Sequence, residues 1–587
     1  MPDYPRIAAR STRKDITDTF RGYHRAMKIG GGEFNDMMNM TSALYPMIAS
    51  RKKRGKVREV SKPAGMLAKE KLAYVADGTL FYDGRETALT GLSDGEKQLV
   101  SMGAYICIFP DKRYFNTADE TDCGSMEAFY SSTGAVVGTM CRVDGSEYAV
   151  PTVGAAPPEE PGAMQLWIDT SGENDVLKQW SGENKNWVEL PSVYTKLRFV
   201  SQGELPRLFN RLDGVKISGA QDERLNGSRI IEAIGGGDGV YDYIVVSGLI
   251  RETLNQTEGC ITISRSVPDM DFVCECKNRL WGCRYGNDGE KNINEIYCCA
   301  LGDFKNWEQF QGLSTDSWRA SVGSDGAWTG AINYLGSPMF FKENVIHTVT
   351  VSSYGAHRVS ETVCRGVQKG CRKSLAIVNE TLYYKSKKDI CAYQGGFPVG
   401  VSTALGDGVY YDAAAGTLGD KYYIAMSDEN GERSLFVYDI GKHLWMKEDA
   451  LNALFFAEYG GDLWCMTDEA LFTMNGSEGE EERFVEWMLE SGMLYYQYPV
   501  RKYMSRFNLR RFDFRLSMEE GAEMDIFIQY DSSGEWEHKG RIKLNGTGTV
   551  TVPVCPRRCD HLRLRLEGKG EFRLFSMARV LEAGSDV

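Results

Sequence analysis

Five closely spaced cysteines are the first candidates for chemistry, because thiolates are good zinc ligands. They are Cys274, Cys276, Cys283, Cys298 and Cys299. Structural zinc sites usually take ligands from paired C-x2-C knuckles, and this spacing does not match that pattern. Phe272, Cys274 and Cys276 would share one face of a strand, where a free thiol behaves as a small hydrophobe. The pattern favours core packing over a metal site.

Histidine is scarce, which limits acid–base catalysis: six histidines occur in 587 residues. His347 lies in the β-branched stretch NVIHTVTV, which predicts a satisfied position inside a sheet, and His443 lies in a predicted turn. The sequence contains no G-x-S-x-G elbow, H-E-x-x-H pair or P-loop. The glycine-rich residues 235–239 have strand-like segments on both sides, so no helix follows to receive a phosphate. An irregular turn is expected there.

Glycoside hydrolysis would require two carboxylates that face each other across a groove. The stretches SDGAW (residues 324–328) and DSSGEW (residues 531–536) are faintly similar to the Asp-box turns of sialidase-like propellers, but neither keeps the S-x-D-x-G-x-x-W spacing. Such boxes are structural turns, and no carboxylate pair stands out elsewhere. The sequence therefore predicts a protein that is not an enzyme and has no catalytic residues, cofactor or metal site.

Composition indicates a large, globular, mainly β protein. The chain has 42% apolar, 11% aromatic and 25% charged residues, with 63 glycines, and its length predicts about two to four domains or one large repeat architecture. Fifteen cysteines, several of them adjacent, fit a reduced state. The N-terminal residues carry scattered charges where a signal peptide would need an apolar stretch, and no apolar run is long enough to span a membrane. We expect a soluble protein made in a cytosol.

Internal repeats indicate the architecture. LAYVADGTLFY (residues 72–82) matches LAIVNETLYY (residues 375–384) as a hairpin of two strands. FVCECKNRLWGC (residues 272–283) aligns without a gap on FFAEYGGDLWCM (residues 455–466), with Leu-Trp in register. YCCALGDFKNW (residues 297–307) follows LFVYDIGKHLW (residues 435–445) in the same way. Short strands with aromatic residues at repeating positions are typical of propeller blades.

The repeats predict one β-propeller of about five to seven blades, over residues 66–120 and 265–480. A pair of β-sandwiches is the alternative. Residues 121–264 interrupt the repeats, contain the linker VPTVGAAPPEEPGAM (residues 150–164), and predict an inserted β-rich projection with Gly-containing turns. From residue 481 to 587, apolar and polar residues alternate, as in RRFDFRLSM and HLRLRLEG, which predicts an antiparallel β-sandwich with one buried face. The alternating arginines predict a solvated strand face, with a phosphate-binding surface as the alternative.

The N-terminal residues 1–65 are expected to form a basic docking segment. Residues 1–62 contain fourteen Lys/Arg against six Asp/Glu, so the remaining 525 residues must carry 21 net negative charges for the total of −13. Residues 32–58 join a Met-rich run, which includes Met37, Met38 and Met40, to six basic residues within eight positions. This asymmetry favours a protein or nucleic-acid contact, with an ordinary solvated loop as the alternative.

The stretch GGGEFNDMMNMTSALYPMIASRKKRG resembles the N-terminal motif of a family of tailed-bacteriophage structural proteins, the stabilization or tail nozzle (tail tubular) proteins. In that motif E-F-x-D-M-x-N-M leads through Tyr-Pro to S-x-R-x-x-R. The matching residues are Glu33, Phe34, Asp36, Met37, Asn39, Met40, Tyr45, Pro46, Ser50, Arg51 and Arg54. The ending with EGKGEFRL and EAGSDV is similar to the last strands of such proteins. The insertion's LWIDTSGENDVLKQWSGENKNWVEL resembles a small hairpin module of phage tail and fibre proteins.

The resemblance implies a non-enzymatic virion protein, synthesised in the host cytoplasm, that forms a homohexameric ring in the tail below the connector. DNA would pass through the lumen, where an acidic surface would keep phosphate from binding. The implied partners are further copies of the chain, connector, adaptor and portal proteins, and tail fibres or other tail proteins. The predicted interface residues are Phe34, Met37, Met40, Tyr45, Pro46, Arg51, Lys52, Lys53, Arg54, Lys56 and Arg58, and the insertion offers Trp167, Trp180 and Trp187 to a partner.

Two other functions remain open. A tail-tip propeller could bind or hydrolyse host glycans through tryptophans exposed on the insertion. Alternatively, the basic run at residues 51–58 could contact DNA directly, which would make binding strongly dependent on salt.

Overall fold

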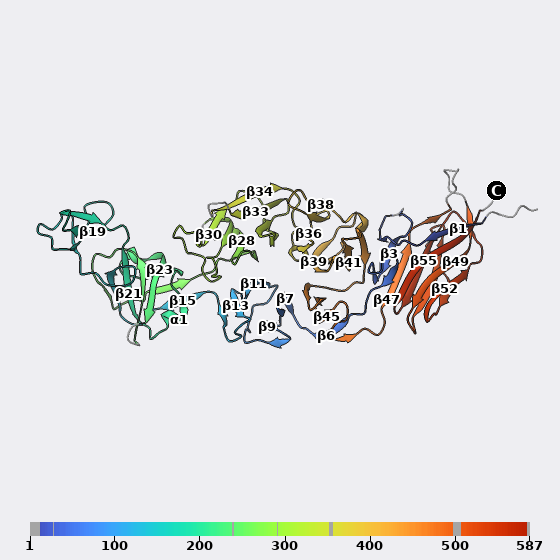
Figure 1. Ribbon diagram of the computed structural model, residues 1–587, viewed down its shortest axis with the longest axis horizontal. Coiled ribbons are helices and arrows are strands. Elements are labelled where there is room, and N and C mark those ends of the chain that lie inside the picture. The colour runs from blue at the N-terminus through green and yellow to red at the C-terminus, as the bar shows by residue number, and fades with distance from the viewer. Residues whose placement is uncertain are drawn as a thin grey trace, which may run out of the picture. The chain divides into compact units, whose positions relative to one another are not determined.

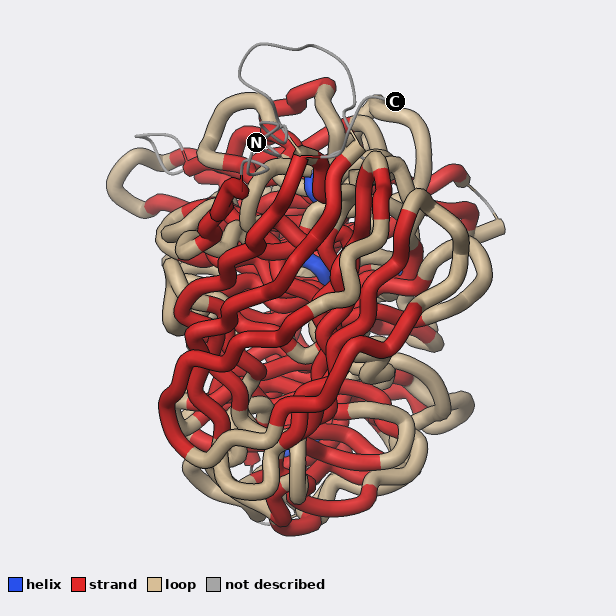
Figure 2. Tube along the Cα trace, turned by 90° about the vertical axis from the view of Figure 1, so that its right-hand side faces the viewer, coloured by secondary structure: helices blue, strands red, loops and turns tan. Residues whose placement is uncertain are grey.

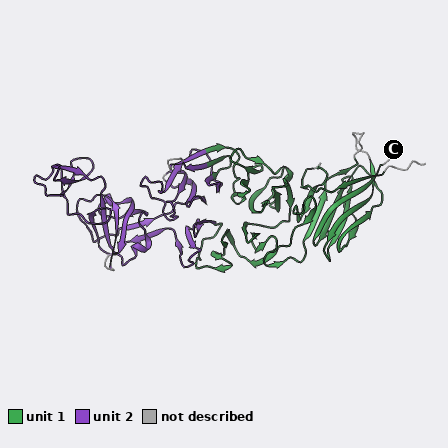
Figure 3. Ribbon diagram, in the orientation of Figure 1, with its two compact units in different colours: residues 1–97, 340–347, 361–587 green, residues 98–339, 348–360 purple. Residues whose placement is uncertain are grey.

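The computed structural model describes residues 12–26, 29–236, 240–289, 291–351, 356–496 and 506–583. Nearly all regular structure in these residues is β, as the composition predicts; the one α-helix is α1 (Leu205–Leu208). The chain forms two compact units (Figure 3): unit 1 holds residues 1–97, 340–347 and 361–587, and unit 2 holds residues 98–339 and 348–360. No helix in the described residues is long and apolar enough to cross a membrane.

Two large sheets of unit 1 are built from both ends of the chain. Sheet A has the order β4-β5-β55-β49-β52, and β1 and β53 pair with β55 and β49. Its strands are β1 (Thr12–Thr17), β4 (Met40–Thr41), β5 (Ile48–Ser50), β49 (Phe507–Met518), β52 (Gly546–Pro553), β53 (Arg558–Cys559) and β55 (Phe572–Ala583). The long strands β49, β52 and β55 lie side by side (Figures 1 and 2).

Sheet B has the order β2-β3-β47-β54-β50-β51, with β48 paired to β54. Its strands are β2 (Gly22–Tyr23), β3 (Glu33–Met38), β47 (Glu486–Ser491), β48 (Leu494–Tyr495), β50 (Glu523–Tyr530), β51 (Glu537–Ile542) and β54 (His561–Lys569). Burial alternates along β50 and β54, which gives each strand one buried and one wetter face. Sheets A and B meet where Trp487 stacks on Phe572 at a centroid distance of 4.1 Å. We call them together the two-sheet domain.

The participation of residues 12–26 and 29–50 in this domain differs from the separate N-terminal segment expected from the sequence. Charge and composition predicted a domain boundary near residue 65. The strands that pair with β3 and β1, which are β47 and β55, lie more than 400 positions away in the sequence, and sequence periodicity cannot indicate such distant partners. The arginines of HLRLRL also have specific partners. Arg563 and Arg565 both pair with Glu490 and lie over the Trp536 ring.

Smaller antiparallel sheets in unit 1 follow one another along the chain. Their strands are β7 (Pro63–Lys69), β8 (Lys71–Ala76), β9 (Thr79–Tyr82) and β10 (Arg85–Glu86); β35 (Ala376–Val378), β36 (Thr381–Lys385), β37 (Ile390–Tyr393) and β38 (Val399–Gly400); β39 (Tyr411–Leu418), β40 (Lys421–Ser427), β41 (Arg433–Asp439) and β42 (Leu444–Lys447). In each sheet the strands are ordered as in the sequence. A further sheet of unit 1 has five strands. They are β43 (Phe455–Tyr459), β44 (Asp462–Met466), β45 (Ala470–Thr473), β6 (Gly55–Glu59) and β46 (Glu480–Glu481).

First strands of these sheets are neighbours. Within unit 1, β35 lies beside β39, β39 beside β43, and β43 beside β7. Side chains such as Tyr74, Phe81 and Trp464 fill the space between two of the sheets. The four-stranded sheet β31 (Gly330–Tyr334), β32 (Ser337–Phe341), β33 (Val345–Val351) and β34 (His357–Val363) has the same strand order.

Unit 2 contains two more sheets of this kind. Their strands are β11 (Gln98–Met102), β12 (Tyr105–Phe109), β13 (Arg113–Asn116) and β14 (Cys123–Ser125), and β27 (Phe272–Glu275), β28 (Leu280–Asn287), β29 (Asn292–Cys298) and β30 (Trp318–Ser321). Again the first strands β11 and β27 are neighbours. A shared core contains Phe109, Met126, Phe304 and Trp307.

The interrupting segment forms its own core in unit 2. Its larger sheet has the order β15-β26-β22-β23-β24-β21-β16-β25. The strands are β15 (Ala128–Ser131), β16 (Val136–Cys141), β21 (Tyr194–Val200), β22 (Gly214–Ser218), β23 (Gly227–Gly236), β24 (Tyr241–Ser247), β25 (Leu254–Gln256) and β26 (Thr262–Arg265). A small sheet contains β17 (Thr152–Gly154), β18 (Leu166–Asp169), β19 (Val176–Ser181) and β20 (Asn186–Glu189). Leu166, Ile168 and Leu177 of the small sheet belong to the same core as the larger sheet.

Candidate functional site

The stretch at residues 33–54 runs through both sheets of the two-sheet domain. Phe34 and Met37 on β3 and Met40 on β4 are buried, and Met37 and Met40 have no exposed surface. Phe34 stacks with Phe20 at a centroid distance of 6.0 Å. These three predicted interface residues therefore have their packing partners inside this chain, which explains why the stretch is apolar without a second protein.

Asn39 makes the turn from β3 to β4. Its φ is +56°, a left-handed conformation that Asn tolerates better than most residues. The Asn39 amide donates to the Glu486 carbonyl at 2.8 Å, and its Oδ1 accepts from Arg51 Nε at 2.8 Å. One side chain therefore fixes the turn, an adjacent strand and the arginine that follows.

Side chains of the same stretch also reach the sheet β39–β42. Lys447 Nζ contacts Asp36 Oδ1 at 2.9 Å, and Ser42 Oγ donates to Asp439 Oδ2 at 2.5 Å. Lys421 Nζ donates to Thr41 Oγ1 at 3.0 Å. The two-sheet domain and this smaller sheet are thus joined by polar contacts from β3, β4 and the residue that follows β4.

Arg54 is the most buried cation of the motif, with 3% of its side chain exposed. Its Nη2 contacts Glu448 Oε2 at 2.6 Å, and its Nη1 contacts Asp449 Oδ2 at 2.6 Å. The second oxygen of Asp449 accepts from Nη2 at 3.0 Å, so this pairing is bidentate. Both acids follow β42 directly. Arg54 therefore ties the N-terminal segment to the end of the sheet β39–β42.

Arg51 extends these contacts into a network. Its side chain is 6% exposed, and Nη1 and Nη2 contact the two oxygens of Glu482 at 2.6 and 3.0 Å. Nη2 also lies 3.4 Å from Asp449 Oδ2. We call Arg51, Arg54, Glu448, Asp449 and Glu482 the arginine network. It sets two cations against three carboxylates, and all five residues belong to unit 1.

Pairing in the arginine network outweighs the effect of burial on charge. Burial alone would raise the pKa of Asp449 and of Glu482, but Arg54 and Arg51 hold both pKa values below the ordinary range. Burial would likewise lower the pKa of Arg54, and Glu448 and Asp449 raise it instead. Each group is therefore more firmly charged in the folded chain than in water, so its neutralisation should cost stability.

Acid should weaken the arginine network. Asp449 and Glu482 have ordinary pKa values of 3.8 and 4.5, and folding lowers both. A carboxyl whose pKa is depressed by folding contributes stability above its unfolded pKa and loses that contribution as the pH falls through the folded pKa. The contribution of the arginine network to the free energy of unfolding should therefore be steady above about pH 5 and decline below it. Urea midpoints measured across this range test the expectation; an equal decline in an Arg51→Met/Arg54→Met variant would contradict it.

The remaining basic and turn residues of the predicted interface are more accessible. Tyr45 is 42% exposed, and Pro46, Lys52, Lys56 and Arg58 are exposed. Lys53 is half-buried and lies 3.9 Å from Glu519. Arg58 donates to the Tyr74 hydroxyl at 2.9 Å, and Lys56 contacts Glu59 at 3.1 Å. A cavity of about 480 Å³ lies beside Leu44, Lys52 and Lys53. Contact with a second protein stays a prediction, and only these accessible residues are placed to make it.

The three tryptophans predicted in the insertion form a cluster on the small sheet. Trp180 and Trp187 are directly opposite each other on β19 and β20, with ring centroids 5.5 Å apart. Trp167 is buried, lies 5.3 Å from Trp187, and donates from its indole to the Gly154 carbonyl. Trp180 and Trp187 remain half-buried, on the face opposite the core residues Leu166 and Ile168. Part of each ring therefore stays accessible on this face.

The five cysteines considered as zinc ligands are buried and not in disulfides. Burial raises the pKa of Cys298 to about 12 and those of Cys274 and Cys299 well above their ordinary value. Metal binding requires a thiolate, and this environment disfavours one. His347 is fully buried, contacts Glu361 at 3.3 Å, and has its pKa lowered by burial.

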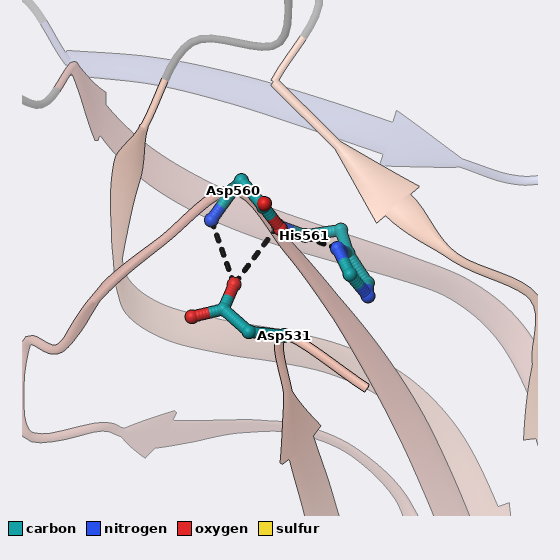
Figure 4. A group of neighbouring side chains, drawn as sticks. All are labelled: Asp531, Asp560 and His561. Atoms are coloured by element: carbon teal, nitrogen blue, oxygen red, sulfur yellow. Dashed lines mark hydrogen bonds and ion pairs between the residues drawn. The ribbon is translucent and has the colours of Figure 1, made fainter. Parts of the chain in front are cut away.

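Asp531, Asp560 and His561 are the only group, within the described residues, that brings three ligand-type side chains within 4.8 Å (Figure 4). Asp531 Oδ1 accepts from the Asp560 backbone N–H at 2.8 Å, and the His561 ring contacts both Asp560 and Ser532. These hydrogen bonds fix the start of β54 and account for the arrangement of the group. All three residues are exposed or half-buried.

Sequence reasoning missed the acidic half of the arginine network. Glu448, Asp449 and Glu482 lie about 400 positions from the arginines, in segments where acidic residues are common. The sequence contains the S-x-R-x-x-R pattern, but a run of basic residues considered alone predicts an exposed surface. Spacing alone gave no signal that two of its arginines are buried.

Comparisons with known proteins identify no family. No family model matches the chain, and no curated protein matches its sequence. Among solved structures, "Phage phi92 endosialidase" is 8% identical over 92% of this chain and 84% of that one, with a TM-score of 0.20. A "Glycoside hydrolase" is 9% identical over 89% of this chain and 99% of that one, with a TM-score of 0.15. TM-scores this low support neither a common fold nor a common function.

Proposed function

We propose that this protein is a non-enzymatic structural subunit of a bacteriophage tail nozzle. Copies would form a homohexameric ring below the connector, and DNA would pass through its lumen. The subunit would be made in the host cytoplasm and contact connector, adaptor and portal proteins on one side and fibres or other tail proteins on the other.

The observation that carries the proposal is the connectivity of the motif. Asn39, Arg51 and Arg54 are separated in the sequence, yet with Glu448, Asp449 and Glu482 they make one continuous set of contacts. Asp36 and Ser50 contribute further bonds, to Lys447 and to the Phe572 backbone. A chance similarity to the motif would not be expected to fall on residues that bond to one another. The motif therefore supports the family resemblance as a structural one.

The arrangement of sheets supports a β-propeller joined to a β-sandwich. First strands that neighbour one another within each unit are what successive blades around an axis require. The β6 strand, paired with β45, would close the last blade with an N-terminal strand. The net charge of −13 suits a channel through which DNA slides, because an acidic wall does not retain phosphate.

Particle size and shape test the proposal. The purified full-length chain, alone or with connector rings, should form closed rings at six times the 65.7 kDa of one chain, visible by electron microscopy and mass photometry. A chain that stays monomeric at high concentration, both alone and with connector rings, would contradict the proposal.

A second candidate is glycan recognition at the tail tip, with or without hydrolysis. The observation that favours it is the half-buried pair Trp180 and Trp187, because aromatic faces stack on the apolar faces of sugar rings. Glycan-array binding that Trp187→Ala abolishes, without ring formation by the intact chain, would support this function over the nozzle.

A further inference from the structure

Unit 2 contains a small apolar cavity that has a buried arginine in its wall. The cavity has a volume of about 200 Å³. Its apolar walls come from Trp281, Leu301, Pro338, Val349 and Val351, and the arginine is Arg279. All six residues belong to unit 2. Leu301 and Val351 are each 47% exposed, so the single chain leaves part of this apolar wall in contact with water.

Arg279 differs from the other buried arginines in having no acidic partner. Four arginines are buried in the described residues, namely Arg51, Arg54, Arg265 and Arg279. The first three each contact a carboxylate. Arg279 is 5% exposed and forms no ion pair with any residue that the structure describes. A buried charge is costly without a counter-charge, so the cavity beside Arg279 favours an anion.

The guanidinium of Arg279 is held in place by backbone carbonyls and keeps unused donors. Its Nη1 donates to the Cys299 and Asp316 carbonyls, each at 2.7 Å, and its Nη2 donates to the Ser314 carbonyl at 2.6 Å. The Nε–H and one N–H of Nη2 make no hydrogen bond within the described part of the chain. A carboxylate can accept two N–H bonds from one guanidinium. Arg279 is therefore oriented, charged and able to bind one.

The other wall residues indicate what the anion would carry. Trp281 donates its indole N–H to the Cys276 carbonyl at 3.3 Å, so its polar atom is already bonded. The His357 ring lies 5.1 Å from the Trp281 ring, and its pKa is lowered by burial and by the charge of Arg279, which keeps it neutral at pH 7. Sugar hydroxyls would lose hydrogen bonds with water against such walls. An aromatic or branched hydrocarbon group would not.

We propose that this cavity binds a small organic acid, whose carboxylate pairs with Arg279 and whose hydrocarbon body contacts Trp281 and the aliphatic side chains. The ligand supplies the counter-charge that the chain lacks, and it covers Leu301 and Val351. Pockets for drug-sized molecules measure about 300–1,000 Å³, so the acid is smaller, with one ring or one branched chain. This binding site goes beyond the proposed structural role and does not depend on ring formation.

Benzoate and benzyl alcohol test the site, because both carry a phenyl ring and only benzoate carries a carboxylate. Each is titrated into the full-length chain and its dissociation constant is measured by ligand-observed NMR. Benzoate should bind at least about tenfold more tightly, since a hydrogen bond to a charged group contributes at least this factor. Equal affinities, or no saturable binding of benzoate, would overturn the proposal.

Two substitutions locate the binding. Leu301→Glu puts a negative charge in the cavity wall at a site that is 47% exposed, so it should fold normally and weaken benzoate binding by at least about tenfold. Val143→Glu, at a residue of unit 2 that is 45% exposed and does not line the cavity, is the matched control and should bind benzoate as the original chain does. Unchanged affinity in Leu301→Glu would show that benzoate binds elsewhere.

Arg279→Met removes the anchor itself, but it also frees three carbonyls, so its thermal unfolding is measured first. A folded Arg279→Met chain that still prefers benzoate to benzyl alcohol would contradict the pairing, and if the variant does not fold, Leu301→Glu decides. Mass photometry of the same samples separates this inference from the proposed function. Rings without benzoate binding would contradict only the inference, and monomers that bind benzoate would contradict only the proposed ring.

Discussion

Arg54→Met should destabilise unit 1 by about 3–5 kcal/mol, the usual cost of removing one partner of a buried ion pair. The substitution keeps the volume of the side chain but leaves Glu448 and Asp449, both 2.6 Å from the guanidinium, without their main counter-charge. Since whole domains are stable by only about 5–15 kcal/mol, this is a large fraction of the total. Urea unfolding followed by tryptophan fluorescence measures it.

The matched control is Lys56→Met, an exposed basic residue of the same run, which should change the unfolding free energy by less than about 0.5 kcal/mol. Arg54→Met combined with Glu448→Met and Asp449→Met should recover much of the loss, because the Arg51–Glu482 pair remains and no charge is left without a partner. Equal stability of Arg54→Met and Lys56→Met would show that the motif's second arginine has no structural role.

Trp487→Ala should cost about 3–5 kcal/mol by opening a cavity where sheets A and B meet. Trp487 is 1% exposed, stacks on Phe572 at 4.1 Å, and donates its indole N–H to the Gly570 carbonyl at 3.1 Å. A Cβ added at Gly568 would lie 2.3 Å from the indole, so the glycine makes room for the ring. The loss should appear in the same urea experiment.

Phe397→Ala removes another aromatic ring at a site that is 75% exposed, and should be nearly neutral. Trp487→Phe should fall between the two, since it keeps a ring against Phe572 and loses only the hydrogen bond and part of the volume. If Trp487→Ala proved no worse than Phe397→Ala, the two large sheets could not depend on this contact.

Local sequence patterns were informative where one strand contacts the next along the chain. The alternation in EMDIFIQY and HLRLRLEGK became the half-buried strands β50 and β54. The gapless repeat of residues 272–283 and 455–466 places Trp281 and Trp464 on the second strands of two sheets. The tryptophan cluster followed from short hairpins, in which pairing partners are only a few residues apart.

Sequence similarity was misleading where two similar hairpins take different positions in their sheets. Residues 72–82 form the second and third strands of their sheet, β8 and β9, whereas residues 375–384 form the first and second, β35 and β36. A hairpin pattern specifies two adjacent strands but not their place in a sheet, because that place depends on contacts with the neighbouring sheet.

By itself, the sequence determined that this is a mainly β protein of short strands, with an insertion, a tryptophan cluster and alternating strands near its end. Those features depend on local periodicity. Tertiary structure alone decided that residues 12–26 and 29–50 complete the two-sheet domain and that Arg51 and Arg54 are buried rather than exposed. The physical reason is that the buried Arg51 and Arg54 are stabilised by carboxylate partners, and these carboxylates come from segments about 400 residues away.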